Sequence, residues 1–323
     1  MHPVLRTVLH RLGLGILTLL AVSVIIFSSL EFLPGGYAEN ILGQGATPET
    51  VEAFKKELGL DRSAVVRYFE WIGNAVQGDF GSSYSGLSGS MKRDVSATIA
   101  PRIYNTFFLA AMAAVIAVPL SLFLGAMAAL HRNSWFDRIV NSVTLTTIAL
   151  PEFFIAYVLM FFLAIKFRWF SPLSTVSADT PFLEHLTRAA LPALTMTLVI
   201  IAHMMRMTRA AIINLLSSPY IEMAQLKGVS RPDVIRRHAL PNAWAPIATV
   251  IAFNMAYLIV GVVVVEVVFV YPGIGQMMVD AVASRDMPVV QACALIFAAT
   301  YILLNLLADI VAIITNPRLL YPK

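Results

Sequence analysis

Six long apolar stretches alternate with polar segments along the chain. They cover roughly residues 12–33, 104–130, 139–165, 189–208, 244–270 and 289–315. Each holds about 20 residues or more, the length that a helix needs to cross the hydrocarbon core of a bilayer. Their apolar residues are consecutive, whereas the strands of a membrane barrel alternate polar and apolar residues. The pattern therefore predicts an all-α polytopic membrane protein with six transmembrane helices.

Composition excludes a soluble enzyme. Of the 323 residues, 58% are hydrophobic and 13% are charged, and the mean hydropathy is +0.76. A soluble domain carries about 25% charged residues, so this chain has too little polar surface to be one. The single cysteine, Cys293, excludes an intrachain disulfide and a cysteine-based zinc cluster. The first apolar stretch exceeds the roughly 7–15 residues of a signal-peptide core, so we expect it to be retained.

Lysine and arginine residues mark one side of the predicted membrane. They gather before the first stretch, between the second and third, between the fourth and fifth, and after the sixth: Arg6, Arg11, Arg132, Arg138, Arg206, Arg209, Lys227, Arg231, Arg236, Arg237, Arg318 and Lys323. The acids of the same segments are Asp137, Glu222 and Asp233. Because loops rich in basic residues stay in the cytoplasm, we expect both termini and the loop 209–243 to be cytoplasmic. The loop 34–103 is then external.

The external loop 34–103 carries signals for two helices. Thr47 suits a helix N-cap, Pro48 suits the first helical position and Gly59 suits a stop. A second amphipathic stretch covers about residues 62–77. We therefore expect a small external satellite region.

A polar, basic insert, residues 217–241, separates the fourth and fifth apolar stretches. Its local signals predict two short helices joined by a glycine turn. These signals are Ser218 as N-cap, Pro219 at the first helical position, Gly228 as a stop, Ser230 and Asp233 as a capping box, and Pro241 just past the end of the second helix. A membrane protein that folds such a compact insert on one side is expected to present it to a partner.

The spacing within this insert resembles a known motif. The insert reads Glu222-x-Ala224-x3-Gly228-x9-His238-x-Leu240-Pro241, which resembles the "EAA" loop of bacterial ABC-importer permeases. That loop runs Glu-Ala-Ala, three residues, Gly, nine residues and Ile-x-Leu-Pro. Two positions depart from it, because Met223 replaces an alanine and His238 replaces the isoleucine.

Flanking segments narrow the resemblance to the dipeptide, oligopeptide and nickel branch of that family. They are residues 78–83, 237–242, 265–269, 271–275, 286–291 and 316–318. The resemblance implies a type I ABC-importer permease fold, surrounded by lipid in the bacterial inner membrane. It also implies a heterodimer with a second homologous permease, two ATP-binding subunits and an external solute-binding protein. ATP and Mg would be bound on partner subunits, so we expect this chain to have no cofactor, no metal and no catalytic site of its own. No contact with nucleic acid is expected.

The resemblance implies that residues 217–228 insert into a cleft on the ATPase subunit. The ATPase-docking candidates are Tyr220, Ile221, Glu222, Ala224, Lys227 and Gly228. Their apolar side chains would fill a groove, and Glu222 would pair with an arginine of the partner. The residues alone leave an alternative open, in which a basic amphipathic loop rests on anionic lipid headgroups.

Acidic residues within the apolar stretches are candidates for the translocation path, because an ionisable group in a membrane usually faces a cavity or a partner. The candidates are Glu152, Glu266 and Asp309. Glu152 follows Pro151 about 14 residues into the third stretch, near mid-membrane at about 1.5 Å rise per residue. The alternatives are that Glu152 and Glu266 are paired inside the bundle as structural groups, and that Asp309 pairs with Arg318 or with a partner chain.

The predicted organisation has four parts: the cytoplasmic N-terminus and first membrane helix (1–33), the external loop region (34–103), a five-helix core that includes the cytoplasmic docking loop 209–243 (104–315), and a cytoplasmic tail (316–323). The resemblance implies import of short peptides by alternating access. Nickel chelates and oligosaccharides are alternative cargoes.

Two other classes of protein compete with this interpretation. A stand-alone channel or secondary transporter needs its own coupling-ion site and often has internal repeats, and neither is visible in the sequence. An intramembrane hydrolase needs a nucleophile and a base, and no spacing connects Ser121, Ser142 and His203. Both alternatives leave the insert 217–241 unexplained.

Overall fold

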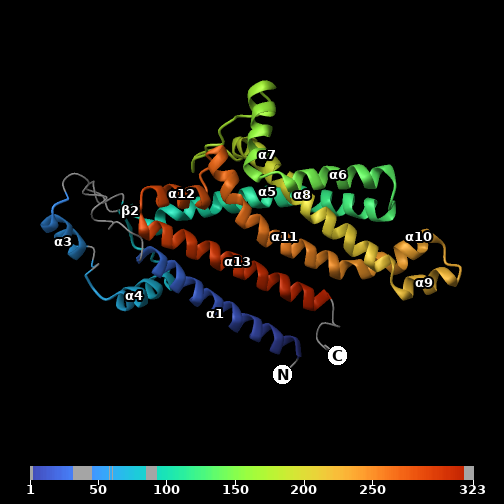
Figure 1. Ribbon diagram of the computed structural model, residues 1–323, viewed down its shortest axis with the longest axis horizontal. Helices are drawn as coiled ribbons and strands as arrows, with labels where there is room; N and C mark the ends of the chain where they lie inside the picture. The colour runs from blue at the N-terminus through green and yellow to red at the C-terminus, as the bar shows by residue number, and fades with distance from the viewer. Residues whose placement is uncertain (1–2, 32–45, 58, 60, 85–92, 316–323) are drawn as a thin grey trace. The chain divides into compact units, whose positions relative to one another are not determined.

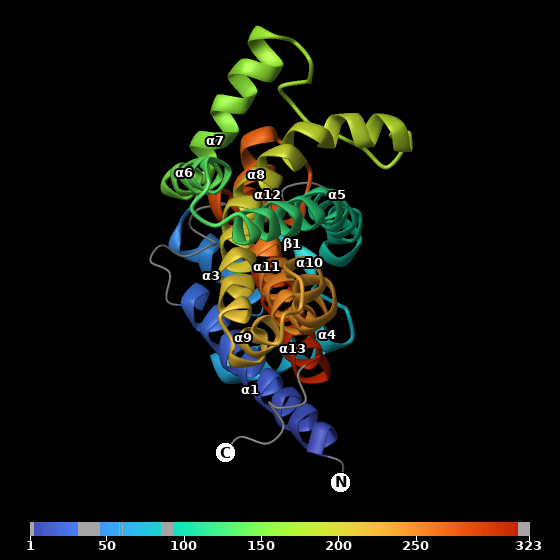
Figure 2. The same ribbon diagram turned by 90° about the vertical axis from the view of Figure 1, so that its right-hand side faces the viewer.

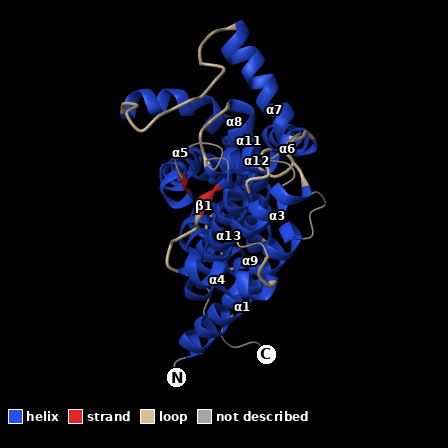
Figure 3. Ribbon diagram, turned by 90° about the vertical axis from the view of Figure 1, so that its left-hand side faces the viewer, coloured by secondary structure: helices blue, strands red, loops and turns tan. Residues whose placement is uncertain are grey.

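The computed structural model describes residues 3–31, 46–57, 59, 61–84 and 93–315. Helix dominates this part of the chain (Figure 3). The strands within it are β1 (Ser82–Ser83) and β2 (Arg93–Asp94), which pair antiparallel with Ser82 opposite Asp94 and Ser83 opposite Arg93. The all-α prediction is confirmed.

Five of the described helices are long and apolar enough to cross a membrane, and they coincide with five of the six predicted stretches. They are α1 (Pro3–Glu31), α5 (Val95–Leu130), α8 (Phe182–Leu216), α11 (Leu240–Phe269) and α13 (Met287–Thr315).

The third predicted stretch is a bent pair of helices rather than one straight helix. It consists of α6 (Trp135–Ala149), α7 (Glu152–Leu159) and a π-helical segment (Met160–Lys166), and the two halves meet at 107° (Figure 2). The residue before a proline is disfavoured in the helical region, and Leu150 accordingly adopts an extended backbone with ψ of 137°. The placement of Glu152 near mid-membrane assumed a straight helix, and that premise is wrong.

Shorter helices complete the described fold: α3 (Pro48–Glu57), α4 (Ala64–Val76), α9 (Pro219–Leu226), α10 (Arg231–Asp233) and α12 (Ile274–Ala283). Both helices expected in the loop 34–103 are present. Thr47 caps α3, since its hydroxyl oxygen accepts a hydrogen bond from the Thr50 amide at 3.3 Å. Gly59 follows α3 with a φ of +66°, as expected for a helix stop.

The chain forms two compact units. The first comprises Met1–Gly15, Tyr104–Gln276 and Thr300–Lys323, and the second comprises Ile16–Ile103 and Met277–Ala299. In the first unit, α8 and α11 run side by side (Figure 1), and α5 joins them in one apolar cluster. Its buried members are Ala129, Ile212, Ala243 and Ile247.

In the second unit, α4 packs on the C-terminal half of α1. The hydroxyls of Ser23 and Tyr68 are 2.8 Å apart, and the ring of Phe27 meets Tyr68 edge-on at a centroid distance of 5.6 Å. Arg67 of α4 forms an ion pair with Glu31 at the end of α1. These contacts attach the amphipathic helix of the predicted satellite region to the first membrane helix.

Candidate functional site

The insert 217–241 begins with α9, and glycine ends this helix as expected. Gly228 has a φ of +78°. The Gly228 amide donates to the carbonyl of Gln225 at 2.9 Å, and the Val229 amide donates to the carbonyl of Ala224 at 3.2 Å. This pair of hydrogen bonds is the Schellman motif, which satisfies the last carbonyls of a helix and requires a left-handed residue at the position of Gly228.

The second half of the insert differs from the prediction. Ser230 does cap the next turn, since its hydroxyl oxygen accepts from the Asp233 amide at 3.4 Å and the hydroxyl donates to the Asp233 carboxylate at 2.7 Å. After α10, however, a π-helical segment (Val234–Ala239) leads without interruption into α11. The expectation that Pro241 lies past the end of a separate helix is therefore wrong. Pro241 is the second residue of α11 and comes directly after the π-helical segment, so the chain stays helical through this proline.

The insert has a small apolar core of its own. Its buried members are Ile221, Ala224, Val234 and Ala239, and Leu215, Leu216 and Val229 pack against them. Ile221 and Ala224 lie three residues apart on one face of α9, which places both side chains toward this core. Ile221 is 0% exposed and Ala224 is 7% exposed. The fold of the insert already covers these two side chains, and their contact with a partner remains a prediction.

The opposite face of α9 is open. Tyr220 is 43% exposed, Met223 is 53% exposed and Leu226 is 75% exposed. Glu222, Lys227 and Gly228 are exposed as well. Met223 was not among the predicted docking residues, although its three-residue spacing from Tyr220 and Leu226 marks one helical face.

A buried ion pair joins α6 to α8 ahead of the insert. Arg209 binds the Asp137 carboxylate through two atoms, with Nε 2.7 Å from Oδ1 and Nη2 2.8 Å from Oδ2. The carboxylate also accepts hydrogen bonds from the Asn133 amide at 2.9 Å and from the Asn141 side chain at 2.6 Å. Such a two-atom pair with its remaining acceptors satisfied holds its helices in one orientation. In the sequence, Asp137 and Arg209 are two charges of separate loops, and no local signal links residues 72 positions apart.

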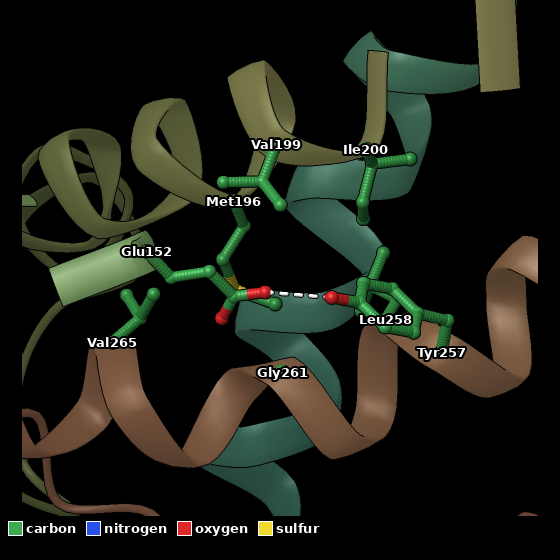
Figure 4. Close-up of a pocket in the computed structure, with 8 residues that line it drawn as sticks. All are labelled: Glu152, Met196, Val199, Ile200, Tyr257, Leu258, Gly261 and Val265. Atoms are coloured by element: carbon green, nitrogen blue, oxygen red, sulfur yellow. Dashed lines mark hydrogen bonds between the residues drawn. The ribbon is translucent and has the colours of Figure 1, made fainter. Parts of the chain in front are cut away.

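Glu152 begins α7 at the bend of the third span. Its Oε1 accepts a hydrogen bond of 2.9 Å from the Tyr257 hydroxyl of α11 (Figure 4). The surrounding side chains are mostly apolar and come from α8 and α11: Met196, Val199, Ile200, Leu258 and Val265. The cavity among them has a volume of about 10 Å³, about enough for one water molecule. The place of Glu152 on the translocation path remains a prediction.

Glu266 is a fully buried structural group. It is 0% exposed, and its Oε1 accepts from the Thr106 hydroxyl at 2.6 Å. Its Oε2 accepts from the backbone amides of Gly275 and Gln276 at 2.7 and 3.1 Å. Those amides belong to the first turn of α12, where a negative charge is favourable. The carboxylate thus caps a helix, which fits the alternative of a structural group inside the bundle, and a place of Glu266 on the translocation path remains a prediction.

The Glu266 carboxylate leaves no room for a side chain at Gly273. A Cβ atom placed on Gly273 would lie 1.9 Å from Oε1 of Glu266, so only glycine can occupy this position. The turn that contains Gly273 follows Val270, which itself has a φ of +52°.

Asp309 pairs within the chain. Its Oδ2 lies 3.0 Å from Nη1 of Arg11, and both side chains are about half exposed. The expected alternatives were Arg318, which lies outside the described residues, and a partner chain. An exposed pair of this kind contributes at most about 1 kcal/mol to stability. A role of Asp309 in the path remains a prediction.

Comparison with known proteins decides the family. Residues 117–321 match the family model described as the binding-protein-dependent transport system inner membrane component, and residues 4–110 match its N-terminal companion model. The chain belongs to this family. A putative peptide transport system permease protein of Brucella abortus (strain 2308) is 36% identical over 97% of this chain and 98% of its own. The glutathione transport system permease protein of Escherichia coli (strain K12) is 37% identical over 98% and 99%.

The family assignment confirms the main prediction from the sequence. The chain is an integral membrane permease of the peptide branch of ABC importers. Members of this family are transport subunits whose ATPase is a separate protein, so the permease is not itself an enzyme. It works in a membrane complex with an ATPase and a substrate-binding protein.

Proposed function

We propose that this permease forms half of the translocation path of an ATP-driven importer of short peptides. The observation that carries the proposal is the folded insert between α8 and α11, which has its own apolar core and an exposed face at Tyr220, Met223 and Leu226. A helix with an apolar face and flanking charges fits a groove on a soluble partner. In this proposal Glu222 and Lys227 make the polar contacts at the rim of the ATPase groove.

The proposed coupling runs along two helices. The insert is continuous with α8 and α11, and Ile212 packs with Ala243 and Ile247 directly beside it. The same two helices supply most of the side chains around Glu152. When the ATPase subunits close, a displacement of the insert would move both helices and rearrange the cavity at Glu152. Alternating access is a rocking of such packed bodies between two arrangements.

The proposed complex contains a second, different permease, two ATP-binding subunits that bind ATP and Mg, and an external solute-binding protein. A cavity of about 10 Å³ at Glu152 admits one water and no peptide, which supports a path completed by a second subunit. The distribution of lysine and arginine supports cytoplasmic termini in a bacterial inner membrane.

Short peptides are the proposed cargo. The relatives that match over nearly their whole length are named for peptide and glutathione transport. These names favour peptides over nickel chelates and oligosaccharides.

The proposal is tested by recovering the partners of the tagged permease. We expect mild solubilisation to recover an ATPase and a second permease, and Glu222→Lys to lose most of the ATPase because it reverses the charge at the rim of the docking face. Mass spectrometry of the purified complex provides the measurement.

A matched control separates docking from general charge effects. Asp179→Lys makes the same charge change at an exposed acid outside the insert and should leave ATPase recovery unchanged. Recovery of the permease alone from wild-type membranes, or equal recovery of the ATPase with Glu222→Lys, would contradict the docking proposal.

A further inference from the structure

A pocket with charged residues in its lining lies in the second unit, and it shares no residue with the insert or with the cavity at Glu152. Its volume is about 260 Å³. Helix α5 contributes Thr98 and Arg102, which are four residues apart and therefore lie one above the other on the same helical face. Helix α12 contributes a face with spacing of three, four and seven residues: Met277, Asp280, Ala281 and Ser284.

The third side of this pocket is the β1–β2 pair. Arg93 of β2 lies opposite Ser83 of β1 in the register and also lines the pocket. The Ser83 hydroxyl donates to the carboxylate of Asp286, and the Tyr84 amide donates to the same carboxylate at 3.1 Å. Asp286 is only 3% exposed, so its charge is committed to holding β1 in place. The strand pair is thereby fixed against the segment that follows α12.

Opposite charges face this pocket from different elements. Arg93 and Arg102 bring two guanidinium groups from β2 and α5, and the exposed Asp280 brings a carboxylate from α12. The hydroxyls of Thr98 and Ser284 donate to backbone carbonyls of their own segments. Among the charged groups that line the pocket, Asp286 holds β1, and Arg93, Arg102 and Asp280 present both signs of charge to a ligand.

We propose that this pocket binds the charged ends of a short peptide, with the peptide carboxylate at Arg93 and Arg102 and its ammonium group at Asp280. Arginine suits a carboxylate because its planar fork forms two parallel hydrogen bonds. The volume of about 260 Å³ lies just below the roughly 300–1,000 Å³ typical of small-molecule sites, which fits a ligand the size of a dipeptide. This inference rests on the proposed peptide cargo and adds a receiving site for it on the side expected to be external.

Binding to the assembled permease–ATPase complex in lipid nanodiscs, without the solute-binding protein, tests the proposal. The probes are dialanine, its C-terminal amide and its N-acetyl derivative, and the measurement is isothermal titration calorimetry. We expect both modified peptides to bind about tenfold more weakly than dialanine, because each has lost one charged end.

Variants assign each end of the peptide to its residue. Arg93→Gln should weaken dialanine about tenfold and leave the affinity for the amide unchanged, because the amide has no carboxylate to lose. Arg93→Lys should give an intermediate affinity, since it keeps the charge without the fork. Asp280→Asn should weaken dialanine about tenfold and leave the affinity for the N-acetyl derivative unchanged, because that derivative has no ammonium group to lose. Arg62→Gln, which removes an arginine outside the pocket, should change nothing.

Three results would overturn the proposal: dialanine does not bind to the wild-type complex, dialanine and its amide bind equally, or Arg93→Gln weakens both probes by the same factor. Elution volume and ATPase rate of each variant report whether the complex is intact.

ATP-dependent uptake into vesicles separates this proposal from the proposed function. If the wild-type complex takes up peptide and the pocket variants bind dialanine normally, the proposal of a peptide site in this pocket fails and the importer proposal is retained. If no peptide enters with ATP, the proposed function fails as well.

Discussion

Glu266 and Glu152 are both acids within apolar stretches, yet their surroundings differ. Glu266 is fully buried and its carboxylate accepts three described hydrogen bonds, two of them from the first turn of α12. Glu152 accepts one described hydrogen bond, from Tyr257, beside a small cavity. We infer that Glu266 stabilises the fold and that Glu152 is free to serve transport.

Glu266→Gln should lower the thermal stability of the permease. The glutamine amide would place its NH₂ group against a backbone N–H or against the Thr106 hydroxyl, and leaving one buried group unsatisfied costs about 1–3 kcal/mol. Thermal unfolding of the purified protein measures the loss. Glu184→Gln, which removes an exposed ion pair with Arg188, should have almost no effect. Equal melting temperatures for wild type and Glu266→Gln would contradict the capping role.

Glu152→Gln should act on transport and spare the fold. The substitution keeps the shape of the side chain and removes a charge beside the cavity, so we expect ATP-dependent uptake to fall several-fold while the melting temperature stays unchanged. Tyr257→Phe removes only the hydroxyl donor and should have a smaller effect in the same direction. The reverse result, a lower melting temperature with normal uptake per folded molecule, would assign Glu152 to the structure of the bundle.

Sequence alone could not separate these two glutamates. Each is one acid in an apolar run, and the groups that distinguish them come from elsewhere in the chain. Thr106, which donates to Glu266, lies 160 positions from it in the sequence. Tyr257, which donates to Glu152, lies 105 positions from it. The partner of Asp309 was missed for the same reason, because Arg11 lies near the opposite end of the chain.

At the scale of elements, local signals predicted the turns well and the bends poorly. The stop at Gly228 and the start of α3 after Thr47 depend on the backbone of a few residues, and both are confirmed. Pro151 lies within the third predicted stretch, but the 107° bend of that stretch was not predicted. Local signals also missed the π-helical segment that carries the chain through Pro241 into α11.

Gly228→Val should uncouple the insert from the ATPase. A Cβ at this position would meet nothing within 4 Å, so the penalty comes from the backbone: a φ of +78° costs a residue with a Cβ roughly 1–2 kcal/mol. That strain would distort the Schellman turn after α9. We expect normal amounts of the protein in the membrane but loss of ATPase recovery and of uptake.

Gly228→Asn is the matched control for this prediction. Asparagine tolerates the left-handed region better than other residues with a side chain, so this variant should retain most of its uptake. If valine and asparagine at this position supported equal uptake, the turn would not matter for coupling.

At the scale of the molecule, the hydrophobic pattern identified the membrane spans because each span must be apolar over its whole length. Five predicted stretches are single helices and the third is a bent pair. The contacts between these spans could not be predicted from this pattern. The Asp137–Arg209 pair between α6 and α8 is an example. The docking residues were predicted partly from the family resemblance, and only the fold of the insert showed that Ile221 and Ala224 support the exposed face from within.

The proposed function requires that this permease moves peptides only when an ATPase acts on the insert. The most direct measurement is uptake of a labelled short peptide into vesicles that contain the permease, its partner permease and the ATPase, with ATP and Mg supplied on the ATPase side and the solute-binding protein on the other. The expected result is uptake that requires ATP and the solute-binding protein and that is lost with Glu222→Lys. Uptake of the same peptide without ATP, unchanged by Glu222→Lys, would contradict it and indicate a channel or secondary transporter.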